Sequence, residues 1–244
     1  MSCLPDNQDA LAQDYILQGD ISDTLIVFAH GAGANMHHDF MVSMSNKLVD
    51  AGFQVYRFNF LYMQVNMQDG KRRPPDRASK LLNHFEQVLI DVGEKIDQGL
   101  INPKRIVLMG KSMGARMSAI ITSNEYCFVS SVAKNIASKI SAVVCLGYPF
   151  VPLKGGEPRL SPIQTNPLPI LIVQGERDKF GGREQVHHWT LSEKTQLCWM
   201  NDGDHSLQPR KSSGHTLEGH LQLAVCSISD FINTQDVCFL QKAE

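Results

Sequence analysis

Three side chains in this sequence have the types and the chain order needed for nucleophilic catalysis: Ser112, Asp178 and His205. A serine hydroxyl attacks well only when a neighbouring base takes its proton, and a histidine base needs a carboxylate to fix its tautomer. Ser112 is the centre of the segment GKSMG at residues 110–114, which follows an apolar run and opens a helical pattern. A GxSxG segment between a strand and a helix predicts a tight turn that projects the serine Oγ above a sheet.

The simplest alternative for this segment is an ordinary glycine-containing turn in which Ser112 caps the helix. Two cofactor motifs do not fit the sequence. A Walker-type phosphate loop needs a glycine where Arg105 stands, and a dinucleotide fingerprint that starts at Gly31 needs its third glycine where Met36 stands. We therefore expect no nucleotide or other organic cofactor.

The acid and the base each have competitors. Asp178 and His205 both follow predicted strands, so they are expected at the same sheet edge as Ser112. Glu176 is the competing acid and Asp204 a weaker one. His205 is the strongest candidate base, because four other histidines fall in predicted helices: His187, His188, His215 and His220.

A glycine-rich turn, HGAG at residues 30–33, follows the first long apolar strand. Such a turn can point a backbone N–H at a developing oxyanion, and the residue after the nucleophile supplies a second N–H. We expect Ala32 and Met113 to be these donors, with Gly33 as the less favoured choice for the first. Gly31 and Gly33 are predicted to border the substrate.

Three histidines near this turn receive structural interpretations. His30 is predicted to hold the turn by hydrogen bonds rather than to act in catalysis. His37 and His38 could suggest a metal pair, but only Asp39 stands beside them and no third ligand follows at a suitable spacing. A solvated loop before a helix is the preferred interpretation, and we expect no metal.

Apolar β-branched runs alternate with helical patterns along the chain, which predicts an α/β fold. The expected architecture is a doubly wound, mostly parallel sheet with helices on both faces. An edge strand is expected near Tyr15–Leu17, and 124–139 is expected to hold a short helix. The six main strands are predicted at Thr24–His30, Gln54–Phe60, Arg105–Gly110, Ala142–Tyr148, Pro169–Gly175 and Thr195–Met200. The helices are predicted at Phe40–Ala51, Ala78–Gln98, Ser112–Ser123, Arg183–Trp189 and Thr216–Ile232.

Two long segments, Leu61–Arg77 and Pro149–Pro167, are predicted to be irregular and to border the site, because each follows a strand end. The second is too short for a large cap domain, so an open pocket is expected. The first carries a basic cluster in which Arg73 is a candidate substrate-binding residue, although a solvated loop is the preferred interpretation of the cluster: Lys71, Arg72, Arg73 and Arg77.

Composition excludes several classes of protein. The formal charge of −2 gives no surplus of cations for nucleic-acid binding, and the apolar runs are far shorter than the roughly 20 residues of a membrane span. No signal peptide is recognised, so a cytoplasmic protein is expected. A hydrophobic share of 43 % and the lack of a linker predict one domain over residues 1–244, with its core at about 15–233. The six cysteines contain no CxxC pair and are expected to be reduced and buried.

From about Thr24 to Ile232 the sequence resembles the α/β-hydrolase superfamily, on the segments FAHGAGA, YRFNF, GKSMGAR, QGERD and GDH. Within it, these segments resemble a small branch that includes testis-expressed proteins and a subunit of a chromatin acetyltransferase complex, with dienelactone-hydrolase-like enzymes as neighbours. The resemblance implies Ser112 as nucleophile, Asp178 as acid, His205 as base and Gly31–Gly33 as the oxyanion turn. Dienelactone hydrolases differ here because their nucleophile is cysteine.

These observations lead to an expected function. The sequence predicts a serine hydrolase, of carboxylesterase or thioesterase type, that cleaves small acyl esters or thioesters through an acyl-enzyme intermediate. The expected partner is therefore a small acyl substrate, and the sequence predicts no oligomeric state. The alternative is a non-catalytic interaction protein on the same scaffold, since a fold does not guarantee its chemistry.

Overall fold

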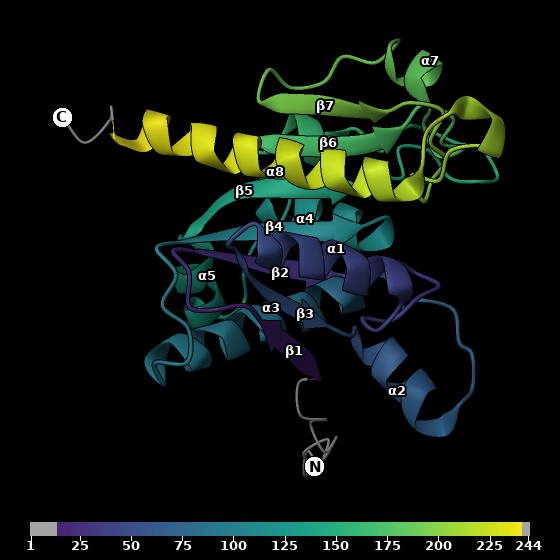
Figure 1. The fold of residues 1–244 in the computed structure, drawn as a ribbon. Coiled ribbons are helices and arrows are strands. Elements are labelled where there is room, and N and C mark those ends of the chain that lie inside the picture. Colours follow the sequence, from purple (N-terminus) through teal and green to yellow (C-terminus); the bar gives the residue numbers. More distant parts are fainter. Residues whose placement is uncertain (1–13, 241–244) are drawn as a thin grey trace.

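A seven-stranded sheet forms the centre of the computed structural model, which describes residues 14–240 and side chains as far as residue 234 (Figure 1). The strand order is β1-β3-β2-β4-β5-β6-β7. As predicted, β2 to β7 are parallel, while β1 pairs antiparallel with β3 at one edge. The strands are β1 (Tyr15–Gln18), β2 (Thr24–Ala29), β3 (Gln54–Phe58), β4 (Arg105–Lys111), β5 (Ile140–Leu146), β6 (Ile170–Gly175) and β7 (Thr195–Met200).

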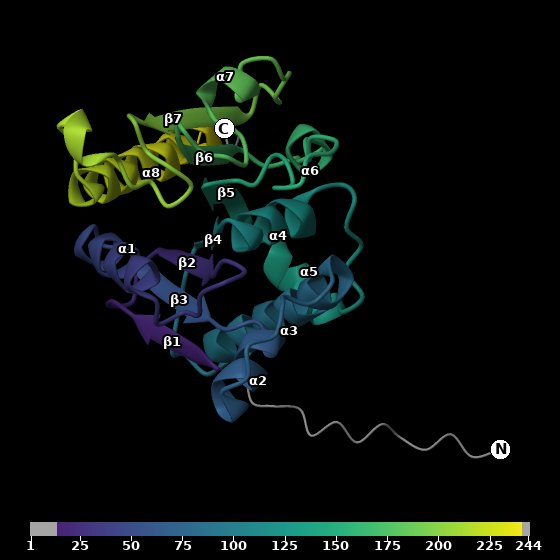
Figure 2. The ribbon, with the colours of Figure 1, turned by 90° about the vertical axis from the view of Figure 1, so that its right-hand side faces the viewer.

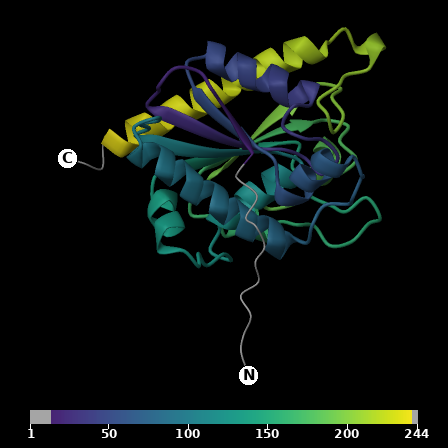
Figure 3. The ribbon, with the colours of Figure 1, turned by 90° about the horizontal axis from the view of Figure 1, so that it is seen from below.

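Helices cover both faces of this sheet, which explains why the inner strands are apolar without alternation. Every residue of β2, β3, β5 and β6 is buried. Figures 2 and 3 show α1 and α8 on one face and α3, α4 and α5 on the other. The helices are α1 (Asp39–Asp50), α2 (Leu61–Asp69), α3 (Ala78–Asp97), α4 (Met113–Thr122), α5 (Ser131–Ala137), α6 (Ser161–Gln164), α7 (Arg183–Val186) and α8 (Leu217–Leu240).

The prediction that Leu61–Arg77 is irregular is wrong in its first half, where α2 forms. The apolar residues of α2 do not recur at helical spacing, so the sequence carries no periodic signal. Gly70, in the left-handed conformation with a φ of 69°, ends the helix. Between β5 and β6 the only helix within the described residues is the four-residue α6, so no large cap domain is present there.

The cysteine prediction needs correction. Cys145 is buried, but Cys127 and Cys226 are exposed, and all of these thiols are free. Both exposed positions have apolar neighbours in the sequence, which misled the prediction. Cys3 and the side chain of Cys238 lie outside the described residues. Among the described residues, no helix is both long enough and apolar enough to cross a membrane.

The backbones of β4 and α4 pack very closely where they cross. A Cβ atom at Gly110 would lie 2.1 Å from the backbone carbon of Gly114, and one at Gly114 would lie 2.4 Å from the carbonyl oxygen of Ala29. Both distances are far below any real van der Waals contact. Glycine is therefore required at both positions if α4 is to begin directly above the ends of β2 and β4.

We expect Gly114→Ala to lower the free energy of unfolding by about 3 kcal/mol or more, because the added methyl group collides with backbone that cannot move away. Gly33→Ala is the matched control, since a Cβ at Gly33 meets nothing within 4 Å. Urea denaturation of both variants measures the effect. Equal midpoints for the two variants would contradict the packing described for the crossing.

Candidate active site

Ser112, His205 and Asp178 form a chain of hydrogen bonds at the carboxyl edge of the sheet. The Oγ of Ser112 lies 2.8 Å from Nε2 of His205, and Nδ1 of His205 lies 2.8 Å from Oδ2 of Asp178. Ser112 stands between β4 and α4, Asp178 follows β6, and His205 follows β7. The structure thus brings together the three residues that the sequence singled out.

The surroundings of Asp178 define the proton positions in this chain. Its side chain is fully buried and accepts further hydrogen bonds from Nε2 of Gln174 at 2.9 Å and from the Phe180 N–H at 2.8 Å. An ionised carboxylate only accepts, so the hydrogen between it and His205 resides on Nδ1. Nε2 of His205 is then left as an acceptor for the hydroxyl hydrogen of Ser112.

The competing acid, Glu176, is engaged elsewhere. Its carboxylate accepts the backbone N–H of Asp202 at 2.9 Å and pairs with Nη1 of Arg183 at 2.6 Å. The hydrogen bond from Asp202, followed by that from Arg183, lowers the pKa of Glu176. Asp204 accepts the backbone N–H groups of Ser206 and Gln208. Of the three acids, Asp178 is the one that contacts the His205 ring.

The backbone at Ser112 has a conformation that side chains rarely adopt, with φ of 53° and ψ of −110°. Its N–H donates to the Leu146 carbonyl at 2.9 Å, which holds the turn against β5. The side chain makes no capping hydrogen bond to α4. The alternative in which Ser112 is only a helix cap is therefore wrong, since its hydroxyl faces His205 instead.

His30 is confirmed as a structural residue. Its ring is fully buried, and Nε2 accepts the Phe60 N–H at 3.0 Å. Nδ1 must then carry the hydrogen, which it donates to the Gly31 carbonyl at 2.7 Å. Burial lowers the pKa of His30 to about 4, so the ring is neutral near pH 7.

These contacts also orient the peptide groups of the glycine-rich turn. The Gly31 carbonyl points toward His30, and in a trans peptide the next N–H, that of Ala32, points the opposite way. The Ala32 carbonyl is held in turn by the Tyr62 hydroxyl at 3.0 Å. Within the described part of the chain, the N–H groups of Ala32 and Met113 donate no hydrogen bond, and Ala32 lines the cavity beside Ser112 whereas Met113 is not among its lining residues.

A cavity of about 530 Å³ opens beside Ser112 and His205. Gly31, Ala32 and Gly33 contribute to its wall, as do the first turns of α1 and α8. Arg73, a candidate for substrate binding on sequence grounds, is not among the lining residues. Its guanidinium forms an ion pair with Asp69, and its backbone bonds to Asn66, so its charge is already matched within α2 and the loop that follows.

Lys111 was missed by the sequence reasoning. Its Nζ donates to the carbonyl oxygen of His205, and burial lowers the pKa of Lys111 to about 8 although Asp178 and Asp204 oppose the shift. This ammonium group holds the turn that carries His205. Its only sequence signal is its position inside GxSxG, where the motif allows any residue.

His220 holds the other side of the same turn. Its buried ring donates from Nδ1 to the Leu207 carbonyl at 2.7 Å. Leu207 has a φ of 64°, which is strained for a leucine, and its side chain is fully buried. The prediction of His220 in a helix is confirmed, but only the fold shows that it reaches the loop after His205.

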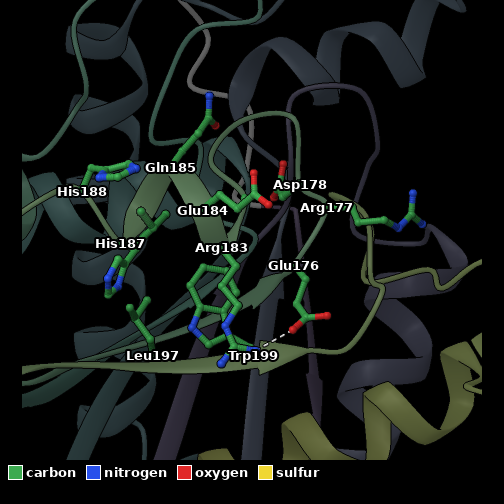
Figure 4. Close-up of a pocket in the computed structure, with 12 residues that line it drawn as sticks. Glu176, Arg177, Asp178, Arg183, Glu184, Gln185, His187, His188, Leu197 and Trp199 are labelled. Atoms are coloured by element: carbon green, nitrogen blue, oxygen red, sulfur yellow. Dashed lines mark hydrogen bonds and ion pairs between the residues drawn. The ribbon is translucent and has the colours of Figure 1, made fainter.

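A larger cavity, of about 1210 Å³, lies along β7 on the far side of Asp178 (Figure 4). Figure 4 shows Arg183 above Trp199, with Glu176 beside it. Neither Ser112 nor His205 lines this cavity, so it is separate from the serine. Among the side chains that the structure describes, residues 14–234, no group of three or more His, Cys, Asp or Glu could hold a metal ion.

Residues 22–233 match the family described as "Alpha/beta hydrolase domain". A similar solved structure is an alpha-beta serine hydrolase homologue from Coxiella burnetii, with a TM-score of 0.62, 20% identity, and coverage of 88% of this chain and 90% of that one. Dienelactone hydrolase from Anabaena variabilis has a TM-score of 0.62, 14% identity and 90% coverage of both chains.

An a/b serine hydrolase without lid from Xanthomonas campestris is also similar, with a TM-score of 0.58, 18% identity, and coverage of 88% of this chain and 89% of that one. At such identities these similarities show a shared fold. No curated protein matches the sequence significantly. The narrower resemblance to testis-expressed proteins stays a prediction.

We expect His30→Phe to lower the free energy of unfolding by about 2 kcal/mol or more at pH 7, because the Phe60 N–H and the Gly31 carbonyl would each lose a buried partner. His37→Phe is the control, as His37 is exposed on the same loop. Denaturant titration compares the two variants. A loss no larger for His30→Phe than for His37→Phe would contradict the role given to the buried ring.

Proposed function

The chain belongs to the alpha/beta hydrolase domain family, and from that premise we propose that it is a serine hydrolase. The proposed substrates are small acyl esters or thioesters, cleaved through an acyl-enzyme intermediate. One observation carries this proposal: the continuous hydrogen-bonded chain from Ser112 Oγ through His205 to the buried Asp178, with 2.8 Å at each step.

In the proposed first half-reaction, Nε2 of His205 takes the hydroxyl proton as Ser112 Oγ bonds to the acyl carbonyl carbon. The carbonyl π electrons move to oxygen, and the Ala32 and Met113 N–H groups stabilise the resulting oxyanion. When the tetrahedral intermediate collapses, the bond to the alcohol or thiol breaks. His205 gives its proton to that leaving group, and the acyl group stays on Ser112.

In the second half-reaction, water replaces the leaving group. His205 takes a proton from water as the oxygen attacks the acyl carbonyl, and the same amides stabilise the second oxyanion. Collapse breaks the bond to Ser112 Oγ, which recovers the proton from His205. Asp178 stays ionised throughout and stabilises the imidazolium that forms in each half-reaction.

The shape of the cavity supports a small-molecule substrate. The connection from β5 to β6 carries only the four-residue α6, so the serine is reached without passing a cap. Esters and thioesters share the acyl carbonyl on which this mechanism acts, and the leaving oxygen or sulfur is protonated in the same step. The proposal therefore covers both classes.

A fluorophosphonate probe should label the wild-type protein, because an activated serine displaces fluoride from phosphorus. Ser112→Ala should abolish labelling. Ser43→Ala, a change to a second serine in the wall of the same cavity, should retain it. Gel fluorescence and peptide mapping locate the label. An unlabelled wild-type protein would favour the alternative, a non-catalytic interaction protein on the hydrolase scaffold.

Asp178→Asn should keep the fold but reduce p-nitrophenyl ester hydrolysis by a factor on the order of 10³ to 10⁴, since the amide no longer fixes the required histidine tautomer. Glu176→Gln is the matched control and should hydrolyse the ester within about threefold of wild type, because its carboxylate bonds to Arg183 and Asp202 instead. Steady-state kcat/KM decides between them. The opposite ranking would transfer the role of the acid to Glu176.

A further inference from the structure

The cavity beside Ser112 extends from the reacting atoms to the first turns of two helices. At one end lie Ser112, His205 and the glycine-rich turn, and at the other lie Phe40 of α1 and Leu217 of α8. Figure 2 shows α1 and α8 together on the same face of the sheet. A substrate whose carbonyl carbon contacts Ser112 therefore has its remaining atoms beside these helices.

The helical end of the cavity is apolar. Its wall is made by side chains from α1, from α8 and from the loop after Asp178, namely Phe40, Met41, Leu217, Leu221 and Phe180. Two of them, Met41 and Leu221, are almost fully buried. Such a surface gains free energy when a hydrocarbon covers it, although the polar side chains of His38, Ser43 and Gln208 also line the cavity.

The charged side chains in the wall do not favour binding of an anionic substrate. The ammonium of Lys111 donates to the His205 carbonyl and interacts with the negative charges of Asp178 and Asp204. Asp39, at the N-terminus of α1, is exposed at the cavity mouth and repels negative charge. The chemistry of the wall thus favours a neutral, apolar group.

The wall is fixed relative to the nucleophile. Lys47 of α1 pairs with Glu218 of α8, and the two helices share one buried cluster under the sheet. His220 binds α8 to the turn that carries His205. These contacts connect the cavity wall to the turn that carries His205.

We propose that this cavity binds a hydrocarbon chain of the substrate, so that the preferred esters are neutral and carry a medium-length chain. The inference rests on the proposed function and deepens it. The cavity volume of about 530 Å³ is in the range of small-molecule sites. The hydrocarbon chain belongs either to the acyl group or to the alcohol of the ester, and the experiment below distinguishes these two cases.

Two ester series make that separation. In the first, p-nitrophenyl esters are lengthened from acetate to octanoate, and in the second, alkyl acetates are lengthened from methyl to octyl. Each buried methylene should raise kcat/KM about two- to fourfold in the series whose chain enters the cavity. A flat or falling kcat/KM in both series, while the fluorophosphonate probe still labels Ser112, would overturn the inference and leave the proposed function intact.

Substitutions in α8 test whether the dependence of kcat/KM on chain length arises in this cavity. Leu217→Trp should reduce the ratio of kcat/KM for the longest to the shortest ester of the responsive series at least tenfold, because the indole fills the space beside Phe40. Leu223→Trp is the matched control on the same helix, since Leu223 is exposed and outside the lining, and it should leave the preference unchanged. Equal effects of the two variants would overturn the assignment of the chain to this cavity.

A binding measurement keeps the inference testable apart from catalysis. With Ser112→Ala protein, octyl acetate or p-nitrophenyl octanoate should raise the Tm more than the matching short ester does. Leu217→Trp in the same background should remove the difference. If the Tm of Ser112→Ala does not depend on the length of the ester and kcat/KM is flat in both series, the proposal is contradicted. If the Tm shift is retained but the fluorophosphonate probe does not label Ser112 in the wild-type protein, the hydrolase mechanism alone is contradicted.

Discussion

The site depends on the close crossing of β4 and α4, which only glycine permits at residues 110 and 114. Because the two backbones nearly touch, the chain must reverse between them within one turn, and Ser112 takes a positive φ at its apex. This strain is sustained by the surrounding sheet, in which β2 and β5 hold β4 on both sides. The consequence is a hydroxyl that stands clear of its own helix and faces His205.

Polar side chains hold the other segments of the site in place: the glycine-rich turn, the turn that carries His205, and Asp178. His30, neutral in its buried setting, orients the glycine-rich turn from below. Lys111 and His220 donate hydrogen bonds to the His205 and Leu207 carbonyls in the turn that carries His205. Asp178 is in turn fixed by Gln174 and by the chain just beyond it. Such pre-organisation matters because hydrogen-bond donors aimed in advance need no reorganisation when charge develops.

The sequence was enough to predict the mostly parallel sheet, the order of its strands along the polypeptide, and the three residues of the hydrogen-bonded chain, because each of these has a local signal. Strands are short apolar runs, and Ser112, Asp178 and His205 each follow one. It failed where the signal is tertiary. Tyr62 lies in a helix with no apolar periodicity, and its contact with Ala32 exists only because α2 folds back over the turn. Arg73 was one candidate substrate contact, although a solvated loop was the preferred interpretation, and its guanidinium pairs with the aspartate four residues earlier.

The central claim is that Ser112 carries the acyl group during turnover, and trapping that intermediate tests it most directly. Protein mixed with a p-nitrophenyl ester and quenched in acid within the first turnovers should contain a fraction heavier by one acyl group. Peptide mass spectrometry should place the added mass on Ser112. Ester hydrolysis that proceeds while Ser112 stays unmodified at every quench time, or an acyl group found on another side chain, would contradict the account.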